Sequence, residues 1–175
     1  FLPAPPSPGL SPLSRDSPYS LVAARLPAAG VHAAWREGRC ACAARCNAGP
    51  LCLIGRAAAR FFGIRTYATH VNGVVRGTST KMWLSRRSPG KAIDPGLLDN
   101  LVGGGIATGY GVLDTLRKEA WEEAGIPPTV AALARPQGRV HLCRAHPQGM
   151  QRGTVFCYDR LLHTVWLPAN PTGHP

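Results

Sequence analysis

The chain has 175 residues, and its 20 lysines and arginines against 9 acidic residues give a formal net charge of +11. This length suits one domain with a small appendage, because single domains run to about 100–200 residues. No stretch approaches the roughly 18 consecutive apolar residues of a membrane helix, so we expect no membrane partner and predict a cytoplasmic location. The charge suits an anionic partner, but the arginines are scattered along the chain, so charge alone does not indicate nucleic acid.

The first part of the chain is poor in regular structure. Residues 1–30 are rich in proline and serine, which disfavour helices and sheet ladders, so we expect a disordered arm. Residues 31–60 are rich in alanine and arginine and are expected to form a partial helical region. Within it, "IGRAAARFFG" predicts a short helix that ends at Gly63.

From residue 64 onward the composition favours an α/β domain. "IRTYATHVNGVVR" predicts a strand with a turn or bulge at Asn72-Gly73, because its residues are β-branched or aromatic around that pair. Residues 88–100 are turn-rich, and "LVGGGIATGYG" predicts a glycine loop before a helix over residues 112–124. Further strands are predicted over residues 81–87, 138–144 and 153–162.

One face of the predicted helix is apolar. Leu113, Leu116, Ala120 and Ala124 recur at helical spacing, so this face is expected to pack against a sheet. The helix ends at Gly125, close to its acidic residues.

Three glutamates, Glu119, Glu122 and Glu123, occupy the adjoining arc of the helix. Like charges three or four residues apart cost a few tenths of a kcal/mol per pair, and here they lie at the negative end of the helix dipole. Either this is a solvated face on which Arg117 and Lys118 dilute the repulsion, or a hard cation such as Mg²⁺ or Mn²⁺ binds the carboxylates. The glycine loop upstream favours the cation, because main-chain groups there can approach a ligand closely.

The stretch from Gly104 to Ile126 resembles the Nudix box, G-x5-E-x7-R-E-U-x-E-E-x-G-U with U aliphatic. Gly104 matches its first glycine, Glu119 the glutamate of R-E, and Glu122 and Glu123 the paired acids. "FFGIRTYATHVNGVV", "MWLSRRS", "DPGLLDNLVGGGIATG" and "GMQRGTVFCYD" extend the likeness over roughly residues 55–160. They are similar to a Nudix subfamily related to a domain attached to thiamine pyrophosphokinases.

The resemblance implies an α/β/α sandwich with a mixed sheet over residues 61–175, shortened at its C-terminus. It also implies metal-dependent hydrolysis of a small-molecule diphosphate, in this subfamily thiamine diphosphate-like compounds, to a monophosphate and phosphate. The expected partner is that small molecule rather than a specific nucleic acid or a membrane. The oligomeric state is left open.

The resemblance also implies roles for particular residues. Glu119, Glu122 and Glu123 would be catalytic and would hold Mg²⁺ or Mn²⁺. The residues expected to contact the substrate or its phosphates are Gly104, Gly105, Arg65, Arg86 and Arg87.

Departures from the box support a second hypothesis. Tyr110 stands where the box has its first glutamate, and Lys118 replaces its arginine, which removes a planar fork that can bind a carboxylate through two hydrogen bonds. The alternative is a degenerate Nudix domain that binds a phosphorylated ligand or a partner without turnover. Asp159 is a candidate general base, although an aspartate closing a strand is more often a turn residue.

Overall fold

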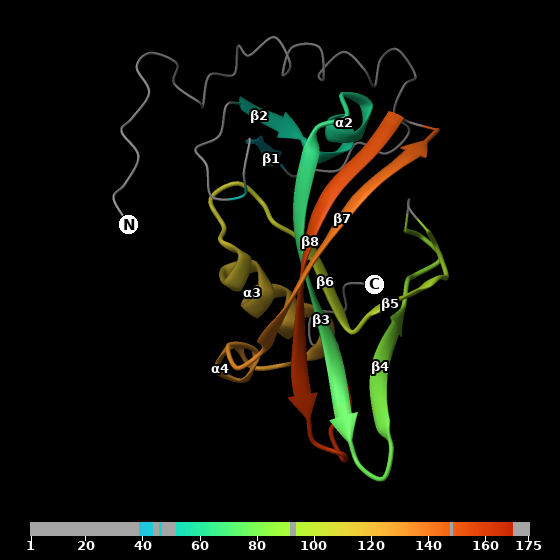
Figure 1. Ribbon diagram of the computed structural model, residues 1–175, viewed down its shortest axis with the longest axis vertical. Helices are drawn as coiled ribbons and strands as arrows, with labels where there is room; N and C mark the ends of the chain where they lie inside the picture. Colours follow the sequence, from blue (N-terminus) through green and yellow to red (C-terminus); the bar gives the residue numbers. More distant parts are fainter. Residues whose placement is uncertain (1–38, 44–45, 47–51, 92–93, 148, 170–175) are drawn as a thin grey trace.

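The computed structural model describes residues 39–43, 46, 52–91, 94–147 and 149–169 (Figure 1). The predicted arm, residues 1–30, lies outside the described residues. The elements in chain order are β1 Arg39–Cys42, β2 Cys52–Gly55, α2 Arg56–Phe61, β3 Arg65–Arg76, β4 Thr80–Arg86, β5 Leu98–Asn100, β6 Val102–Gly105, α3 Val112–Ala124, α4 Pro128–Ala131, β7 Arg135–His146 and β8 Gly149–Leu162.

The main sheet is mixed and is built around β3. Its strands run in the order β5-β4-β3-β8-β7, and β6 also pairs with β3. β3 pairs with β8 in parallel along almost its whole length, whereas its other edge pairs antiparallel, first with β6 and then with β4. The predicted mixed α/β architecture is confirmed, and the strands expected over residues 64–76, 81–87, 138–144 and 153–162 correspond to β3, β4, β7 and β8.

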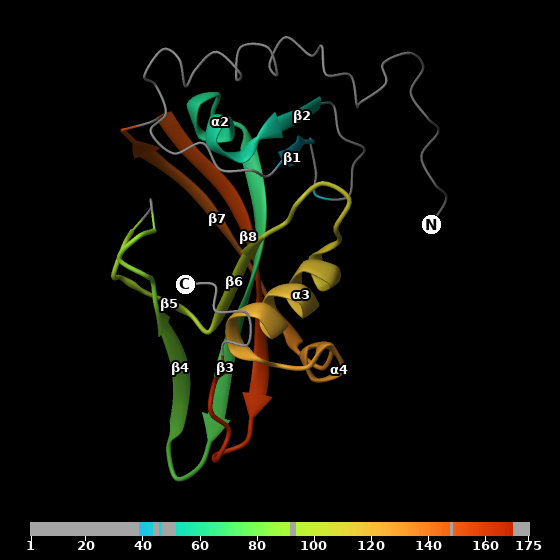
Figure 2. The ribbon, with the colours of Figure 1, turned by 180° about the vertical axis from the view of Figure 1, so that it is seen from behind.

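Helix α3 packs on one face of the sheet and lies in front of β6 and β3 in Figure 2. The predicted face was right for Leu116, Ala120 and Ala124, which are buried in the core. It was wrong for Leu113, which is 46% exposed. Leu113 belongs to the first turn of α3, and Thr115 is buried instead, where its hydroxyl donates to the carbonyl of Gly111 over 3.0 Å.

The prediction of a turn or bulge at Asn72-Gly73 was wrong, because β3 is continuous through both residues. The Asn72 amide donates across the sheet to Asp159 over 2.8 Å. Gly73 leaves room for core side chains: a Cβ there would overlap Leu101 and lie 2.9 Å from Leu162. Asparagine and glycine here serve contacts between strands rather than a reversal of the chain.

Two other segments also differ from the sequence prediction. The glycine-loop prediction was wrong for Val102–Gly105, which form strand β6. Residues 31–60 contain the predicted helix as α2, with Gly63 just after it at a φ of 61°, but the described part also contains the antiparallel pair β1 and β2. None of the helices in the described ranges is long and apolar enough to cross a membrane.

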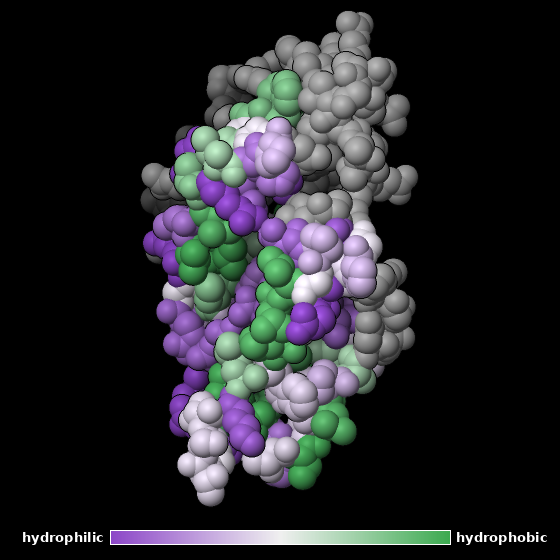
Figure 3. All heavy atoms as spheres, turned by 90° about the vertical axis from the view of Figure 1, so that its right-hand side faces the viewer, coloured by the Kyte–Doolittle hydropathy of each residue, from purple (hydrophilic) through white to green (hydrophobic). Residues whose placement is uncertain are grey.

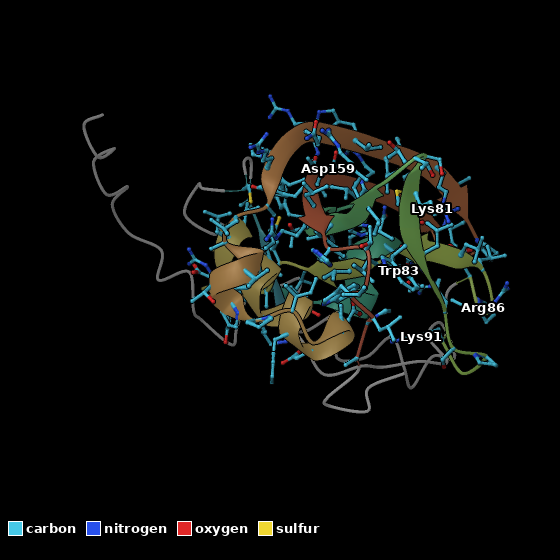
Figure 4. The ribbon with its side chains drawn as sticks, turned by 90° about the horizontal axis from the view of Figure 1, so that it is seen from below. Lys81, Trp83, Arg86, Lys91 and Asp159 are labelled. Atoms are coloured by element: carbon cyan, nitrogen blue, oxygen red, sulfur yellow. The ribbon has the colours of Figure 1, made fainter. Side chains whose placement is uncertain are left out.

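The sheet has an α3 face and an open face. Side chains alternate along a strand, so Thr69 and Val71 of β3 point toward α3, whereas His70, Asn72 and Val74 define the open face. The sheet curves around the open face (Figure 4), and Arg144 of β7 donates to Asp94, beyond β4, over 3.0 Å. Within the described ranges, no helix covers the open face at β3.

Candidate functional site

The candidate site is built on the glycines of β6. Glu119 lies against Gly104, which is the glycine that begins the Nudix-box pattern. β6 pairs with β3 so that Gly104 is opposite Thr69, and both face α3. A Cβ on Gly104 would overlap the Cγ and Cδ of Glu119 and would lie 2.8 Å from its Oε1. The absence of a side chain at Gly104 therefore allows the Glu119 carboxylate to lie directly on the backbone of β6.

Glu123 binds the neighbouring glycine. The Gly103 N–H donates to Glu123 Oε2 over 2.8 Å. Loss of water around this carboxylate raises the pKa of Glu123, and the nearby charges of Glu119 and Asp99 raise it further, against the lowering effects of the Gly103 N–H and Lys91. Glu123 is exposed as a residue, but the Gly103 hydrogen bond holds one oxygen of its carboxylate against the strand. Negative charge is therefore concentrated at the outer edge of β6.

Glu122 is held differently from the other two glutamates. Lys118 Nζ donates to Glu122 Oε2 over 2.6 Å and, over a longer 3.3 Å, to Glu119 Oε1. The hydrogen bond to Glu122 is the main cause that raises the pKa of Lys118. Among the described residues, no three His, Cys, Asp or Glu side chains are gathered as a complete metal site. The structure thus brings Glu119 and Glu123 to the glycine strand and leaves Glu122 on Lys118.

The raised pKa of Glu123 predicts how the metal-free fold responds to pH. A carboxyl whose pKa is higher in the folded chain than in the unfolded chain stabilises the fold below the unfolded pKa, about 4.3, and this contribution is lost as pH rises through the folded pKa. Glu123→Gln should therefore raise the melting temperature of metal-free protein at neutral pH. The gain should shrink as pH falls below the unfolded value, as measured by thermal unfolding in chelator.

Asp114→Asn is the matched control for this measurement, because Asp114 is an exposed acid of the same helix that lies 3.7 Å from Arg117. It should show no comparable gain at neutral pH. An equal gain in both variants, or a Glu123→Gln gain that persists in acid, would contradict the assignment of this pH dependence to Glu123.

The predicted arginines lie in three different places. Arg87 Nη1 donates to Asp99 Oδ2 over 2.7 Å, and the charge of Asp99 in turn acts on Glu123. Arg86 donates to the carbonyl of Gly96 over 2.8 Å, and Figure 4 shows it beyond β4, away from α3. Arg65 is exposed at the start of β3, opposite Arg152. Only Arg87 is brought near the acidic residues.

Sequence analysis missed two charged residues of this site. Asp99 adds negative charge beside Glu123, and Lys91, labelled in Figure 4, is the cation whose charge acts on that carboxylate. Both come from the turn-rich segment before β6, which the sequence marked only as a connection. The signal that could have identified Asp99 is its position two residues before the apolar Leu101, which is buried, and within the segment that pairs with β4.

A chain of polar side chains crosses the open face beside the same glycines. His70 Nδ1 lies 2.7 Å from Asn100 Oδ1, the Asn100 amide donates to Asn72 Oδ1, and the Asn72 amide donates to Asp159 Oδ1 over 2.8 Å. The prediction that Asp159 is a turn residue was wrong, because it lies inside β8. The His70 ring covers Gly103, where a Cβ would lie 3.1 Å from Cε1 and Nε2. Gly103 therefore lies between the acidic site, where it bonds Glu123, and the open face, where His70 covers it.

The donor set suits a hard divalent cation. Carboxylate oxygens are the ligands that Mg²⁺ and Mn²⁺ prefer, and Glu119 and Glu123 present theirs at adjacent glycines. Burial raises the pKa of Glu123 and the charge of Glu119 raises it further, and a bound cation would offset both the lost hydration and the repulsion.

The sequence places this site in a known family. Residues 66–171 match the family described as the NUDIX domain, and this range includes β6 and α3. The chain belongs to the Nudix family.

Relatives of this Nudix chain include two proteins of Arabidopsis thaliana. Nudix hydrolase 24, chloroplastic, is 41% identical over 128 residues, which cover 73% of this chain and 35% of the relative. Nudix hydrolase 20, chloroplastic, is 40% identical over 119 residues, which cover 67% of this chain and 32% of the relative. The chain therefore spans about a third of the length of these curated relatives.

The fold also has a solved counterpart. The crystal structure of DR0079 from Deinococcus radiodurans matches with a TM-score of 0.55 and 24% identity, covering 77% of this chain and 76% of that chain. At this identity the likeness concerns the fold, and it supports the mixed-sheet architecture described above.

Proposed function

We propose that this Nudix chain is a divalent-metal-dependent hydrolase that cleaves a diphosphate linkage in a small molecule, releasing a monophosphate and phosphate. The observation that carries the proposal is the position of Glu119 and Glu123 on the backbone of Gly104 and Gly103. By its resemblance to the thiamine pyrophosphokinase-related subfamily, the proposed substrates are thiamine diphosphate-like compounds. We further propose that residues 61–175 form the hydrolase domain, which includes the matched range 66–171.

The glutamates have distinct tasks in this proposal. Glu119 and Glu123 would hold Mg²⁺ or Mn²⁺ at the edge of β6, and Glu122 would join them by leaving Lys118. Such a cation would supply charge neutralisation for the diphosphate and a lowered pKa for a bound water. Lys118, no longer bonded to Glu122, would present its charge to the anionic substrate from the same helix.

Positive charge for the phosphates comes from the segment between β4 and β6. The charge of Lys91 acts on the carboxylate of Glu123, which is a proposed ligand of the cation. We therefore propose that Lys91 binds a phosphate oxygen of the substrate. Gly104, Gly105 and Arg87 are proposed substrate contacts close to the glutamates. Arg65 and Arg86 lie apart from them and would contact only parts of a substrate that extend beyond the diphosphate.

A binding domain without turnover is the second candidate. Two observations favour it: Lys118 occupies Glu122, and Tyr110, at the place of the first glutamate of the box, is 52% exposed and provides no carboxylate. Such a domain would bind phosphorylated ligands at the same glycine strand.

The cytoplasmic location remains a prediction, since the two Arabidopsis relatives carry the word chloroplastic in their names.

Phosphate release tests the proposal. Purified protein with Mg²⁺ should release phosphate from thiamine diphosphate, and chelator should abolish the release, because the carboxylates alone cannot neutralise the diphosphate. The measurement is a colorimetric phosphate assay with thiamine monophosphate as a substrate control that should release none. Saturable binding of thiamine diphosphate without phosphate release would favour the degenerate domain.

A further inference from the structure

Strand β7 is an exposed edge of the main sheet. It runs beside β8 in Figure 1 and pairs with it along one side, and no strand in the described ranges pairs with its other side. Every residue from Arg135 to Ala145 is exposed, so both faces of this strand are open to solvent. Proteins usually shorten or cover an edge strand, because its outward N–H and C=O groups can pair with a further strand. In β7 that edge is long and uncovered.

The free edge of β7 is regular over a defined stretch. The register with β8 shifts between Pro136 and Gly138, and proline provides no N–H for pairing. Toward the other end of the strand, Arg144 donates to Asp94 over 3.0 Å and is held there. Residues 139–143, whose register with β8 is unbroken, lie between these two limits. An added strand would therefore pair with residues 139–143.

The opposite edge of the main sheet is different. Figure 3 shows apolar residues gathered over the middle of the side that carries β4 and β5, and Leu98 of the edge strand β5 is 58% exposed. However, β5 has only 3 residues, fewer than the roughly 5–6 of an ordinary strand. Strand addition is therefore expected at β7 rather than at β5.

The side chains of β7 define what a matching strand would carry. The strand contains arginines and histidines but no acid. Its register with β8 places Arg139 and His141 on the α3 face, and no acidic side chain in the described ranges forms an ion pair with Arg139. Val140 and Leu142, which are 49% and 37% exposed, lie on the open face. The matching strand has acids on one face and apolar residues on the other.

The sequence of this chain contains no such strand. A second copy of β7 would bring no acid to Arg139 in any register, because β7 has none. Acids on one face of a strand are two positions apart, and no two of the 9 acids of this chain have that spacing. The charges of β7 thus disfavour pairing between copies of this chain and favour a strand from a different protein.

We propose that β7 is a docking edge for an extended segment of another protein in which acidic residues alternate with apolar ones. The segment adds a strand beside residues 139–143, so that backbone hydrogen bonds supply affinity and alternate side chains supply selectivity. Its acids face Arg139 and His141, and its apolar residues lie beside Val140 and Leu142. The docking edge uses none of the glutamates of α3, so it is independent of the proposed hydrolase activity.

A synthetic peptide that alternates glutamate with valine is the probe for this edge. It should bind the unmodified protein, as measured by fluorescence anisotropy. It should also slow hydrogen exchange at alternate backbone N–H groups of residues 139–143, because only alternate residues of an edge strand point their N–H outward. The same peptide with all its backbone nitrogens methylated keeps its charges but donates no backbone hydrogen bond, so it should bind at least about tenfold more weakly.

Charge reversal at Arg139 tests the choice of partner. Arg139→Glu should weaken binding of the glutamate–valine peptide about fivefold, because like charges then face each other across the pair. A lysine–valine peptide should bind Arg139→Glu more tightly than it binds the unmodified protein, a gain that misfolding cannot produce. Arg76→Glu is the matched control, because Arg76 is an exposed arginine at the end of β3, and it should leave both affinities unchanged.

Several results would overturn the docking edge. One is folded protein that does not bind the glutamate–valine peptide, and another is slowed exchange that falls outside β7. Equal binding of the methylated peptide, or of a single-stranded oligothymidylate of the same charge, would show attraction to any polyanion in place of strand addition. Equal losses in Arg139→Glu and Arg76→Glu would likewise contradict the assignment of the acids to Arg139.

Discussion

Glu119→Gln should lower the rate of Mg²⁺-dependent phosphate release by about 100-fold, which corresponds to about 2.7 kcal/mol of transition-state stabilisation. The amide keeps the size of the side chain, so it can still lie on Gly104, but it loses the charge that holds the cation. Glu119 should be more sensitive than Glu122, because Glu119 already lies on the backbone of β6 and its hydrogen bond to Lys118, at 3.3 Å, is longer than the 2.6 Å bond that holds Glu122. The measurement is kcat/KM with thiamine diphosphate.

Asp114→Asn provides the control for charge removal from the same helix. Asp114 accepts the N–H of Gly111 over 3.2 Å at the start of α3, a bond that asparagine can also accept. Its rate should stay within about twofold of the unmodified protein, since Asp114 is an exposed charge in the first turn of α3 with no contact to β6 in the described part of the chain, and such a charge contributes little. Equal losses in the two variants would show a general effect of negative charge on α3 rather than a specific role of Glu119.

Gly104→Ala should lower activity with little cost to the fold. The new Cβ would overlap the end of the Glu119 side chain, and the backbone of Gly104 is fixed by its pairing with Thr69. Glu119 must therefore rotate away. Because it is a flexible and partly exposed side chain, this should cost less than the 1–3 kcal/mol or so typical of overpacked cores. We expect at least about a tenfold loss of kcat/KM, or 1.4 kcal/mol, with a melting temperature close to that of the unmodified protein.

A double-mutant cycle would connect the two predictions. If Gly104→Ala acts by displacing Glu119, the combination with Glu119→Gln should be little worse than Glu119→Gln alone, because residues that act together are not additive. Gly77→Ala is the glycine control, since a Cβ there would meet only Ser79 O at 3.8 Å. Additive losses would mean that the alanine acts by another route, such as a shift of β6.

The helix and its acids could be predicted because the information is local. The spacing of Leu116, Ala120 and Ala124 indicates the buried face, and Gly125, at a φ of 66°, ends the helix as expected. The three glutamates follow from the box. Their different partners could not be predicted, because the hydrogen bond of Glu123 depends on Gly103, a residue of a strand that the glycine-rich sequence did not reveal.

Strand β6 and the polar chain were missed for related physical reasons. Glycine has low strand propensity, yet in β6 it allows Glu119 and His70 to lie on opposite faces of the backbone. The bond from Asn72 to Asp159 joins residues that are 87 positions apart. It depends on the parallel register of β3 and β8, which no short-range pattern in the sequence indicates.

Calorimetric titration of the folded protein with Mn²⁺ tests the central claim most directly, namely that the carboxylates at the glycine strand hold a divalent cation. The structure predicts saturable uptake that weakens at least about tenfold in Glu119→Gln, a loss of 1.4 kcal/mol, and stays unchanged in Asp114→Asn. Absence of uptake by folded protein, or equal uptake by Glu119→Gln, would contradict it.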